Sequence, residues 1–346
     1  MPTQRVHSPT AAGHRSGVPA LAASVGIDRV RGRYAGAQAV VTGGAGFVGA
    51  HVCRAMHAAG LRVHAIDSLI TGSRSNLADL LDEPGVTLEE ADVVDHLEVP
   101  EDVAVVLHLA SPASPVDYLR HPIHTLKVGS IGTLHALGVA KATGARFLLA
   151  STSEVYGDPQ VHPQPETYLG NVDPTGPRGV YDEAKRFGEA MTYAYERDHA
   201  VEVRVARIFN TYGPGMRADD GRLVPTLIGQ ALAGEALTIH GDGEQTRSLC
   251  FIDDLVDGLL RLLVADRSAP CNLGSDVEVT VLDVADRIRG LIDSNLEVVH
   301  IDRPSTDPQR RRPDLRVARD LLGWQAEVDL DDGLQRTIAW ARSARS

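Results

Sequence analysis

The stretch from residue 39 to residue 67 constrains the fold more than any other part of this 346-residue chain. Ala39-Val40-Val41 reads as a buried strand and runs into Thr42-Gly43-Gly44-Ala45-Gly46-Phe47-Val48-Gly49. A helical pattern continues to Ala59, and a second strand ends in Asp67. Glycines at 43, 46 and 49 would permit a tight turn, close approach of the backbone to a pyrophosphate, and close packing of helix on strand. The stretch therefore predicts the first half of a dinucleotide-binding fold.

Asp67 indicates which dinucleotide is expected. It lies about 20 residues past the glycines, where a carboxylate accepts hydrogen bonds from a ribose 2′-hydroxyl and repels a 2′-phosphate. NAD is therefore expected rather than NADP. The expected cofactor contacts lie on the glycine loop, on the loops that follow later strands, and on two helices: Gly43, Gly46, Phe47, Val48, Asp67, Thr71, Gly72, Asp92, Val93, Leu109, Ala110, Ser111, Lys127, Ala150, Tyr181 and Lys185.

Further apolar stretches read as strands at 86–90, 103–109, 146–150 and 201–208. The stretch 103–109 is apolar on both faces, as a central strand of a parallel sheet should be. The expected fold class is α/β, with a Rossmann-type doubly wound parallel sheet in the order 3-2-1-4-5-6. A smaller, interleaved C-terminal lobe is expected to bind the substrate.

These patterns divide the chain into a leader, a cofactor domain and a lobe. Residues 1–33 hold one acidic residue, Asp28, among many small and basic ones, and we expect a disordered leader there. Residues 37–208 are expected to form the NAD-binding domain, with elements returning around 241–267. Residues 209–240 and 268–346, where glycine and proline become frequent, are expected to form the substrate-binding lobe.

Charge and cysteine usage narrow the class of partner and the compartment. A net charge of −12 argues against a nucleic-acid or anionic membrane surface, and no apolar run approaches the length of a membrane span. The scattered Cys53, Cys250 and Cys271 favour a reducing, cytoplasmic compartment and argue against a disulfide framework. The histidines are equally dispersed, so we expect no metal site.

Two short stretches bring acid–base side chains to one edge of the sheet. Ser151-Thr152-Ser153-Glu154 follows the strand at 146–150, at the end where open α/β sheets bind ligands. Tyr181 and Lys185 are four residues apart on one helix, so they share a face and can act on the same atom. A phenol with a pKa of about 10 needs a drop of about 3 units to ionise near neutrality, and a nearby ammonium group favours such a drop.

The combined pattern resembles the extended short-chain dehydrogenase/reductase superfamily from Ala37 to about Thr337. Within that superfamily the chain is most similar to the UDP-glucuronate decarboxylases. The glycine loop and Tyr181-x-x-x-Lys185 are common to the superfamily. Thr152-Ser153-Glu154 and Gln245-Thr246-Arg247 are more discriminating, and stretches such as 108–115 and Arg312-Pro313-Asp314 extend the likeness.

The resemblance implies a hidden redox cycle on the glucuronosyl ring of UDP-glucuronate. NAD would oxidise C4, the resulting β-keto acid would lose CO₂ through an enolate, and C4 would then be reduced again. Tyr181 would act as the base and Lys185 would hold the nicotinamide ribose. Thr152 would bind the C4 oxygen, while Ser153 and Glu154 would face C5, with Glu154 handling a proton directly or through water.

Arg247 would hold the sugar carboxylate or assist proton delivery, with diphosphate binding as its competing role. The remaining expected substrate contacts are Asn210, Arg217, Arg222, His240 and Arg311. Three positions depart from the family pattern: Gly129 and His135 stand where Asn is usual, and Gly215 stands where Arg is usual. These departures bear on retention of the reduced cofactor, so UDP-xylose is the default product and UDP-4-keto-pentose stays open.

Rival functions from two classes remain: another nucleotide-sugar enzyme on the same scaffold, and a protein without catalytic activity. A nucleotide-sugar 4,6-dehydratase of this superfamily carries Asp where this chain has Ser153, and a 4-epimerase lacks the counterpart of Glu154. A non-catalytic NAD-binding protein is the rival from another class, but it would gain nothing from the Tyr181, Lys185 and Glu154 set. The helices expected near 123–143 and 181–197 offer apolar faces, so a homodimer is expected.

Overall fold

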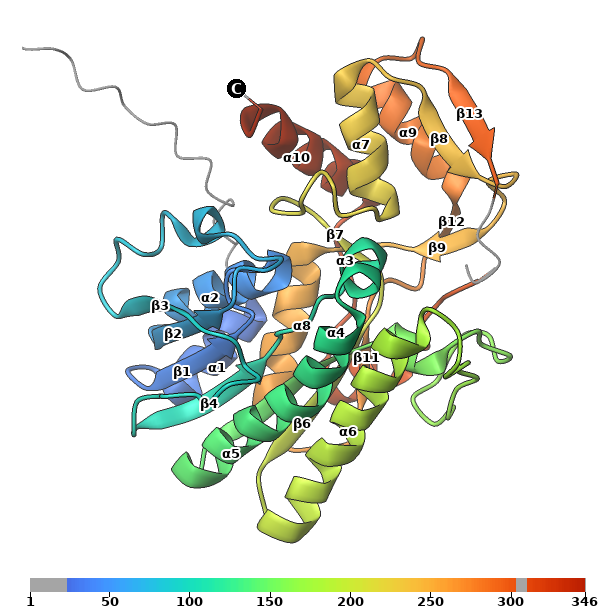
Figure 1. Cartoon of the computed structure of the whole chain (residues 1–346). Helices are drawn as coiled ribbons and strands as arrows, with labels where there is room; N and C mark the ends of the chain where they lie inside the picture. The colour runs from blue at the N-terminus through green and yellow to red at the C-terminus, as the bar shows by residue number, and fades with distance from the viewer. Residues whose placement is uncertain (1–23, 303–309, 346) are drawn as a thin grey trace, which may run out of the picture.

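A seven-stranded parallel sheet organises the molecule, in the order β3-β2-β1-β4-β5-β6-β11 (Figure 1). The computed structural model describes residues 24–302 and 310–345. The α/β fold class and the strand order 3-2-1-4-5-6 are confirmed, and one further strand extends the sheet at its far edge. The strands are β1 (Gln38–Thr42), β2 (Arg62–Asp67), β3 (Val86–Glu90), β4 (Val103–His108), β5 (Arg146–Thr152), β6 (Val203–Ile208) and β11 (Cys271–Leu273).

Helices cover both faces of this sheet, which is why its central strands are apolar throughout. On β5, which is wholly buried, Leu148 joins the core under one layer, while Phe147 and Leu149 join the core under the other. One layer holds α1 (Val25–Tyr34), α2 (Phe47–Ala58) and α8 (Ile252–Val264). The other holds α4 (Pro122–Lys127), the π-helical turn η2 (Val128–Gly132), α5 (Thr133–Thr143) and α6 (Gly179–His199).

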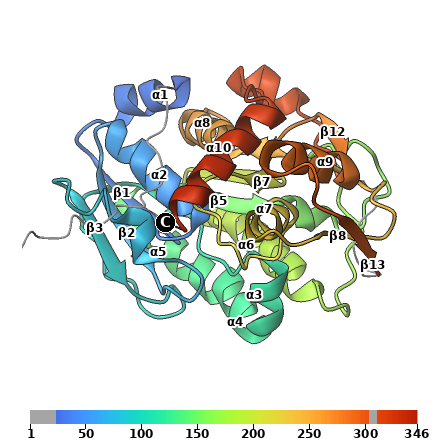
Figure 2. The same cartoon turned by 90° about the horizontal axis from the view of Figure 1, so that it is seen from above.

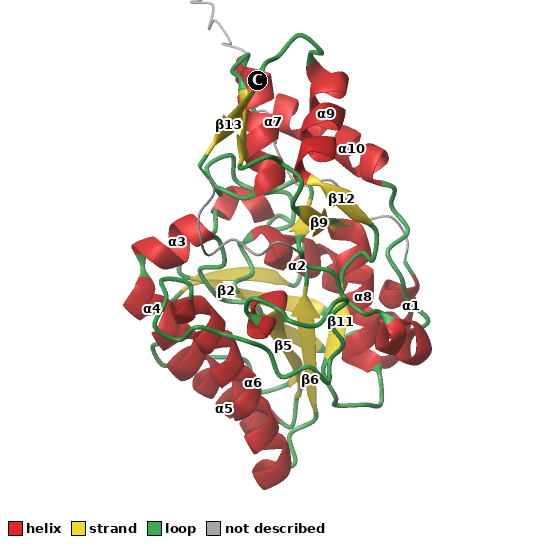
Figure 3. Cartoon of the chain, turned by 90° about the vertical axis from the view of Figure 1, so that its right-hand side faces the viewer, coloured by secondary structure: helices red, strands yellow, loops and turns green. Residues whose placement is uncertain are grey.

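A smaller lobe stands above the sheet (Figures 1 and 3). Its strands pair two by two: β7 (Thr211–Tyr212) with β10 (Cys250–Phe251), β8 (Leu237–His240) with β13 (Val298–Ile301), and β9 (Thr246–Ser248) with β12 (Glu278–Thr280). Its helices are α7 (Leu223–Ala233), α9 (Val281–Ile292) and α10 (Leu330–Ser343). The short elements η1 (Arg74–Leu77), α3 (Pro115–Arg120), η3 (Ser153–Tyr156) and η4 (Ala318–Leu322) complete the described chain.

The prediction of a disordered leader up to residue 33 is wrong for residues 24–33; the rest of that leader lies outside the described residues. Val25–Tyr34 forms α1, which packs beside α8 (Figure 2). Ile27 and Val30 are buried there, and the Gly26 amide donates to Asp257 Oδ1 at 2.7 Å. Ser24 caps the helix by accepting from the Ile27 amide at 3.1 Å.

The lobe boundary expected at residue 268 also needs correction. β11 lies beyond it in sequence but pairs in parallel with β6, so it belongs to the main sheet. Conversely, β9 lies within the expected returning stretch 241–267 and pairs with β12 in the lobe. The two units are interleaved more finely than the sequence pattern indicates. No helix among the described residues is both long and apolar enough to cross a membrane.

Candidate active site

A cavity of about 590 Å³ lies between the sheet and the lobe. The glycine loop after β1, the ends of β4 and β5 and the start of α6 line it from below. The lobe contributes residues of β8 and β9 and of the segment before α7. This is the position at which doubly wound sheets bind ligands.

The glycine loop fits a dinucleotide. Gly43 has φ +70°, and a Cβ there would lie 2.7 Å from the Ala110 amide nitrogen. A Cβ on Gly49 would lie 2.0 Å from the Gly43 carbonyl oxygen, so helix α2 can begin this close to the loop only with glycine. Gly46, the residue before α2, offers no side-chain cap, which leaves the first N–H groups of the helix for phosphate oxygens.

Asp67 ends β2 with its carboxylate held in place by the backbone. Oδ2 accepts from the Ala45 amide at 3.0 Å, and Oδ1 accepts from the Leu69 amide at 2.8 Å. Burial raises the pKa of Asp67, and these backbone N–H groups act against that rise. The carboxylate lines the cavity where a ribose hydroxyl could donate to its remaining lone pairs.

Most of the expected cofactor contacts line this cavity; Gly72 and Lys127 do not. A Cβ on Gly72 would lie 2.7 Å from Asp67 Oδ1, so glycine at 72 lets the following loop pack directly on that carboxylate. Lys127 is exposed on α4, away from the lining. Asp92 lies at the cavity wall, with its Oδ2 3.3 Å from His124 Nε2.

Tyr181 and Lys185 lie in the first turns of α6, and both line the cavity. Tyr181 is hydrogen-bonded to the Thr152 side chain and stacks on Tyr118, with ring centroids 5.2 Å apart. Lys185 Nζ donates to the Ala150 carbonyl at 2.8 Å and lies 5.9 Å from the centre of the Tyr181 ring. The structure thus brings together the phenol, ammonium and hydroxyl that the sequence placed at one sheet edge.

The expected drop in the pKa of Tyr181 is not present in the protein alone. Burial raises the pKa of its phenol above the usual value of 10, and the hydrogen bond with Thr152 counteracts this only in part. Burial also lowers the pKa of Lys185 to about 8. Tyr181 therefore carries its proton in this state, and ionisation requires additional positive charge beside the ring.

Glu154 is clamped by two arginines that come from different parts of the chain. Arg178, just before α6, pairs with Oε2, and Arg311 pairs with Oε1. Burial alone would raise the pKa of Glu154, but the charges of Arg311 and Arg178 hold it below its usual value. Glu154 is thus ionised, and the three side chains together carry one net positive charge.

Arg178, Tyr118 and Asp182 line or border this site but were not among the residues predicted from the sequence. Asp182 is 5% exposed, and its Oδ1 has no hydrogen-bond partner in the described structure. Burial, together with the charge of Glu154, raises its pKa to about 7. Arg178 could have been found from its spacing, because residues 178 and 181 share a face of the helix start; nothing in the sequence distinguishes Tyr118.

The expected substrate contacts all line the cavity, but most already have protein partners. Arg222 pairs with Asp220, with Nη2 to Oδ2 at 2.7 Å. Arg247 Nη1 donates to the Thr246 carbonyl at 2.8 Å, and His240 Nδ1 donates to the Asp302 carbonyl at 3.0 Å. Asn210, Arg217 and Arg311 complete the set, with Arg217 paired to Asp117 and Arg311 paired to Glu154.

Three positions were expected to depart from the family pattern: Gly129, His135 and Gly215. A Cβ on Gly129 would lie 2.6 Å from the Ala184 Cβ, so glycine lets η2 approach α6 closely. His135 Nδ1 donates to the Val93 carbonyl at 3.0 Å. Gly215 has φ +93° and lines the cavity.

Fold and cavity together define a nucleotide-binding enzyme of the short-chain dehydrogenase/reductase type, with a Tyr/Lys pair beside a dinucleotide cleft. The chain belongs to the NAD dependent epimerase/dehydratase family, whose model matches residues 39–274.

The chain also shares high sequence identity with individual proteins of known name. The chain is 50% identical over 301 residues to UDP-glucuronic acid decarboxylase 1 of Danio rerio, covering 87% of this chain and 72% of the relative. It is 47% identical over 296 residues to UDP-glucuronic acid decarboxylase 5 of Arabidopsis thaliana, covering 85% of this chain and 86% of the relative.

Solved structures with the same fold include epimerases. UDP-glucose 4-epimerase from Thermotoga maritima, solved with UDP-glucose, superimposes with a TM-score of 0.81 at 27% identity, covering 89% of this chain and 100% of that one. UDP-glucuronic acid 4-epimerase from Bacillus cereus, solved with UDP-glucuronic acid and NAD, gives a TM-score of 0.79 at 25% identity, covering 89% of this chain and 99% of that one.

Proposed function

We propose that this chain is an NAD-dependent UDP-glucuronate decarboxylase that works through a C4-keto sugar and forms UDP-xylose, UDP-4-keto-pentose or both. The observation that carries the proposal is the meeting of Tyr181, Lys185 and Thr152 with a Glu154 clamped by two arginines. The identity of about half of all aligned residues with UDP-glucuronic acid decarboxylases supports the choice of substrate.

Oxidation at C4 depends on the Tyr181 side chain. When bound, NAD⁺ supplies the acceptor for the C4 hydrogen, returns it later, and brings positive charge to the phenol. Tyr181 takes the proton of the C4 hydroxyl, while Thr152 holds the oxygen through a hydrogen bond. Lys185, fixed by the Ala150 carbonyl, favours the ionised phenol by its charge.

Loss of CO₂ needs stabilisation of the enolate at C4 and a proton at C5. The Tyr181 hydroxyl, now protonated, and Thr152 donate to the C4 oxygen as its negative charge develops. Each turnover replaces a carboxylate with a C–H bond, so one proton is taken up from solvent. We infer that Ser153 and the ionised Glu154 orient a water that delivers this proton, because the lowered pKa of Glu154 argues against its carrying the proton itself.

The arginines that hold Glu154 also suit a uronic acid. The net positive charge of Glu154, Arg178 and Arg311 would attract the substrate carboxylate, whereas a neutral hexose gains nothing from it. Arg247 lines the opposite, lobe side of the cavity and is the proposed contact for the sugar carboxylate or the diphosphate. Asn210, Arg222 and His240 are the further proposed substrate contacts.

A substrate panel tests this function. The protein is incubated with NAD and UDP-glucuronate, UDP-glucose or dTDP-glucose, and CO₂ and nucleotide sugars are followed by mass spectrometry. We expect CO₂ and a pentose product from UDP-glucuronate alone. Conversion of UDP-glucuronate to an isomer of equal mass would establish a 4-epimerase, and loss of water from a hexose substrate would establish a dehydratase.

We further propose a homodimer in a reducing, cytoplasmic setting. Ile123, Ile131, Leu134 and Phe187 are exposed on α4, η2, α5 and α6, where apolar side chains gain from burial against a second copy. The described cysteines, Cys53, Cys250 and Cys271, are free and buried, as expected where thiols stay reduced.

A further inference from the structure

The segment 213–222 joins β7 to α7 and lies along the cavity, between the lobe and the cofactor-binding half of the molecule (Figure 1). It rests against α3: Gly221 has φ +78°, and a Cβ there would lie 2.6 Å from Val116 Cγ2. Gly215, Met216 and Arg217 of this segment line the cavity together with Thr71 on the opposite side. We call residues 213–222 the strap.

One anchor holds the start of the strap to the helix that follows the glycine loop. His51 Nε2 donates to the Pro214 carbonyl at 2.9 Å. Burial lowers the pKa of His51 to about 4, so its imidazole is neutral near pH 7. The hydrogen bond between His51 and Pro214 therefore does not change with pH near neutrality.

The second anchor is Arg217, which joins three segments through one guanidinium group. Nη2 lies 3.0 Å from Asp117 Oδ1 and 3.1 Å from Oδ2 on α3. Nη1 donates to the Thr71 carbonyl at 3.2 Å, on the loop after β2. Nε donates to Asp219 Oδ1 at 3.1 Å within the strap itself. With each nitrogen engaged, Arg217 is a connection across the cavity more than a phosphate ligand.

The carboxylate of Asp117 is held in position for its ion pair with Arg217. Its carboxylate is 9% exposed, and Ser114 Oγ donates to its Oδ2 at 2.7 Å, which fixes its orientation. Charge-assisted pairs with such geometry are about twice as strong as neutral hydrogen bonds. Thr71 follows Asp67 on the same loop, so the bonds of Arg217 close the cavity at the end where the adenosine ribose of NAD is expected.

We propose that Arg217 is a latch that retains the reduced cofactor between oxidation and re-reduction of C4, and so sets the ratio of UDP-xylose to UDP-4-keto-pentose. The product part of this inference rests on the proposed function. If the reduced cofactor leaves early, its two electrons leave with it and the sugar is released as the ketone.

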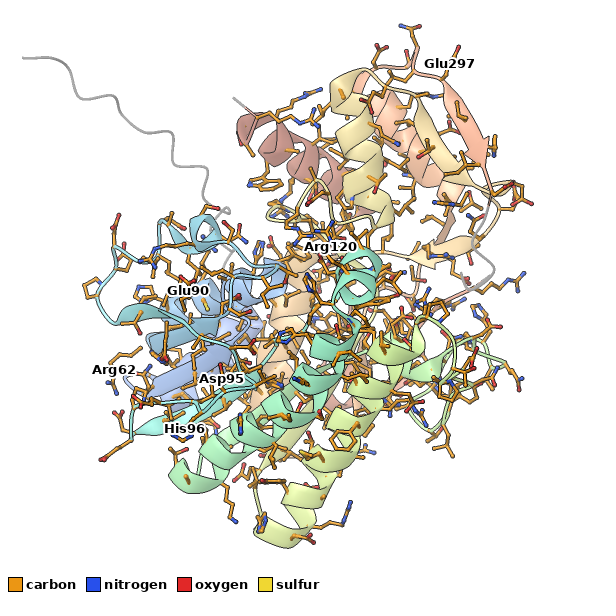
Figure 4. The ribbon with its side chains drawn as sticks, viewed as in Figure 1. Arg62, Glu90, Asp95, His96, Arg120 and Glu297 are labelled. Atoms are coloured by element: carbon orange, nitrogen blue, oxygen red, sulfur yellow. The ribbon has the colours of Figure 1, made fainter. Side chains whose placement is uncertain are left out.

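The latch is tested first without any sugar substrate. The holoprotein is loaded with NADH, chased with excess NAD⁺, and dissociation is followed by nicotinamide fluorescence. We expect Arg217→Ala and Asp117→Asn each to raise the dissociation rate about tenfold, with the double variant no faster than Arg217→Ala because the Asp117 carboxylate acts only through Arg217. Arg120→Ala is the matched control, since Arg120 is exposed at the end of the same helix α3 (Figure 4).

The second measurement is product partition from UDP-glucuronate. The fraction of UDP-4-keto-pentose should rise severalfold in both latch variants and stay at the wild-type value in Arg120→Ala. NADH dissociation within twofold of wild type in both Arg217→Ala and Asp117→Asn would overturn the latch. If the wild type releases no CO₂, the proposed function fails while the dissociation rates still decide the latch.

Discussion

The hydroxyl of Tyr181 is the single atom on which the proposed oxidation depends. Tyr181→Phe keeps the ring that stacks on Tyr118, so the fold and cofactor binding should survive. Removing the base should lower kcat by about 10²- to 10⁴-fold, the usual contribution of a positioned acid–base group. Steady-state kinetics with UDP-glucuronate measures the loss of kcat, and NADH binding measures whether the cofactor site is retained.

Tyr193→Phe is the control for that experiment. Tyr193 is on the same helix but donates its hydroxyl to the Ser268 carbonyl at 3.0 Å, outside the cavity. Its loss should leave kcat within about twofold. Wild-type turnover in Tyr181→Phe would remove that phenol from the mechanism.

Asp182 should make stability depend on pH. Its pKa is raised from 3.8 to about 7, and the charged groups that face it are Glu154, Arg178, Arg311 and Glu183. Between these values the native state holds a proton that the unfolded state has lost. Stability from this group is therefore complete below about pH 4 and is lost as pH rises through 7.

Asp182→Asn should remove this dependence. Between pH 5.5 and 8 the wild type should lose about 2 kcal/mol that the variant keeps, as measured by urea unfolding at both pH values. Asp198→Asn, exposed near the end of the same helix, should behave as wild type. Equal pH dependence in Asp182→Asn and wild type would contradict the raised pKa.

At the residue scale, the sequence was sufficient to predict which side chains meet at the site when they belong to short local patterns. Thr152, Glu154, Tyr181 and Lys185 lie on two short stretches at one sheet edge, so strand ends and helix spacing were enough to group them. The clamp on Glu154 was not predictable, because Arg311 is far along the chain and its approach depends on the path of the lobe. Arg311, an expected substrate contact, lines the cavity while its guanidinium group pairs with Glu154.

At the scale of elements, α1 is held to α8 by close backbone contact. A Cβ on Gly26 would lie 2.7 Å from the Asp257 carbonyl oxygen and 2.8 Å from Leu260 Cβ. Gly26→Ala should therefore destabilise the protein by about 1–3 kcal/mol through overpacking. Gly32→Ala, on the same helix with no other atom near its would-be Cβ, should be neutral or stabilising by up to about 1 kcal/mol.

Urea unfolding of both variants measures the contrast. Equal stability of Gly26→Ala and Gly32→Ala would mean that α1 does not depend on this packing. The sequence predicted disorder for this helix because residues 24–34 are mostly polar and small. Among their large apolar side chains, only Ile27 and Val30 are buried. The β-α-β unit at 39–67 was predictable because the spacing of its glycines and the acidic residue at the end of its second strand form a known sequence motif.

At the scale of the whole molecule, the exposed apolar face of α4, α5 and α6 should pair two copies. Ile123 is 65% exposed and Phe187 is 47% exposed, although both are large and apolar. Phe187→Asp should convert a dimer to a monomer by placing a charge in that interface. Light scattering after size exclusion measures the change.

Val277→Asp is the comparison for the dimer. Val277 is 66% exposed on the lobe, away from these helices, so its substitution should leave the mass unchanged. A monomeric wild type, or a Phe187→Asp variant that remains dimeric, would contradict this interface.

The central claim is that CO₂ leaves after transient oxidation of C4 within one closed cavity. The most direct measurement is turnover of unlabelled UDP-glucuronate in D₂O, with deuterium located in the product by NMR. UDP-xylose formed in this way should carry one deuterium at C5 and none at C4, because the C4 hydrogen returns from the cofactor while C5 is protonated from solvent. Deuterium at C4, or CO₂ release without any deuterium at C5, would contradict the account.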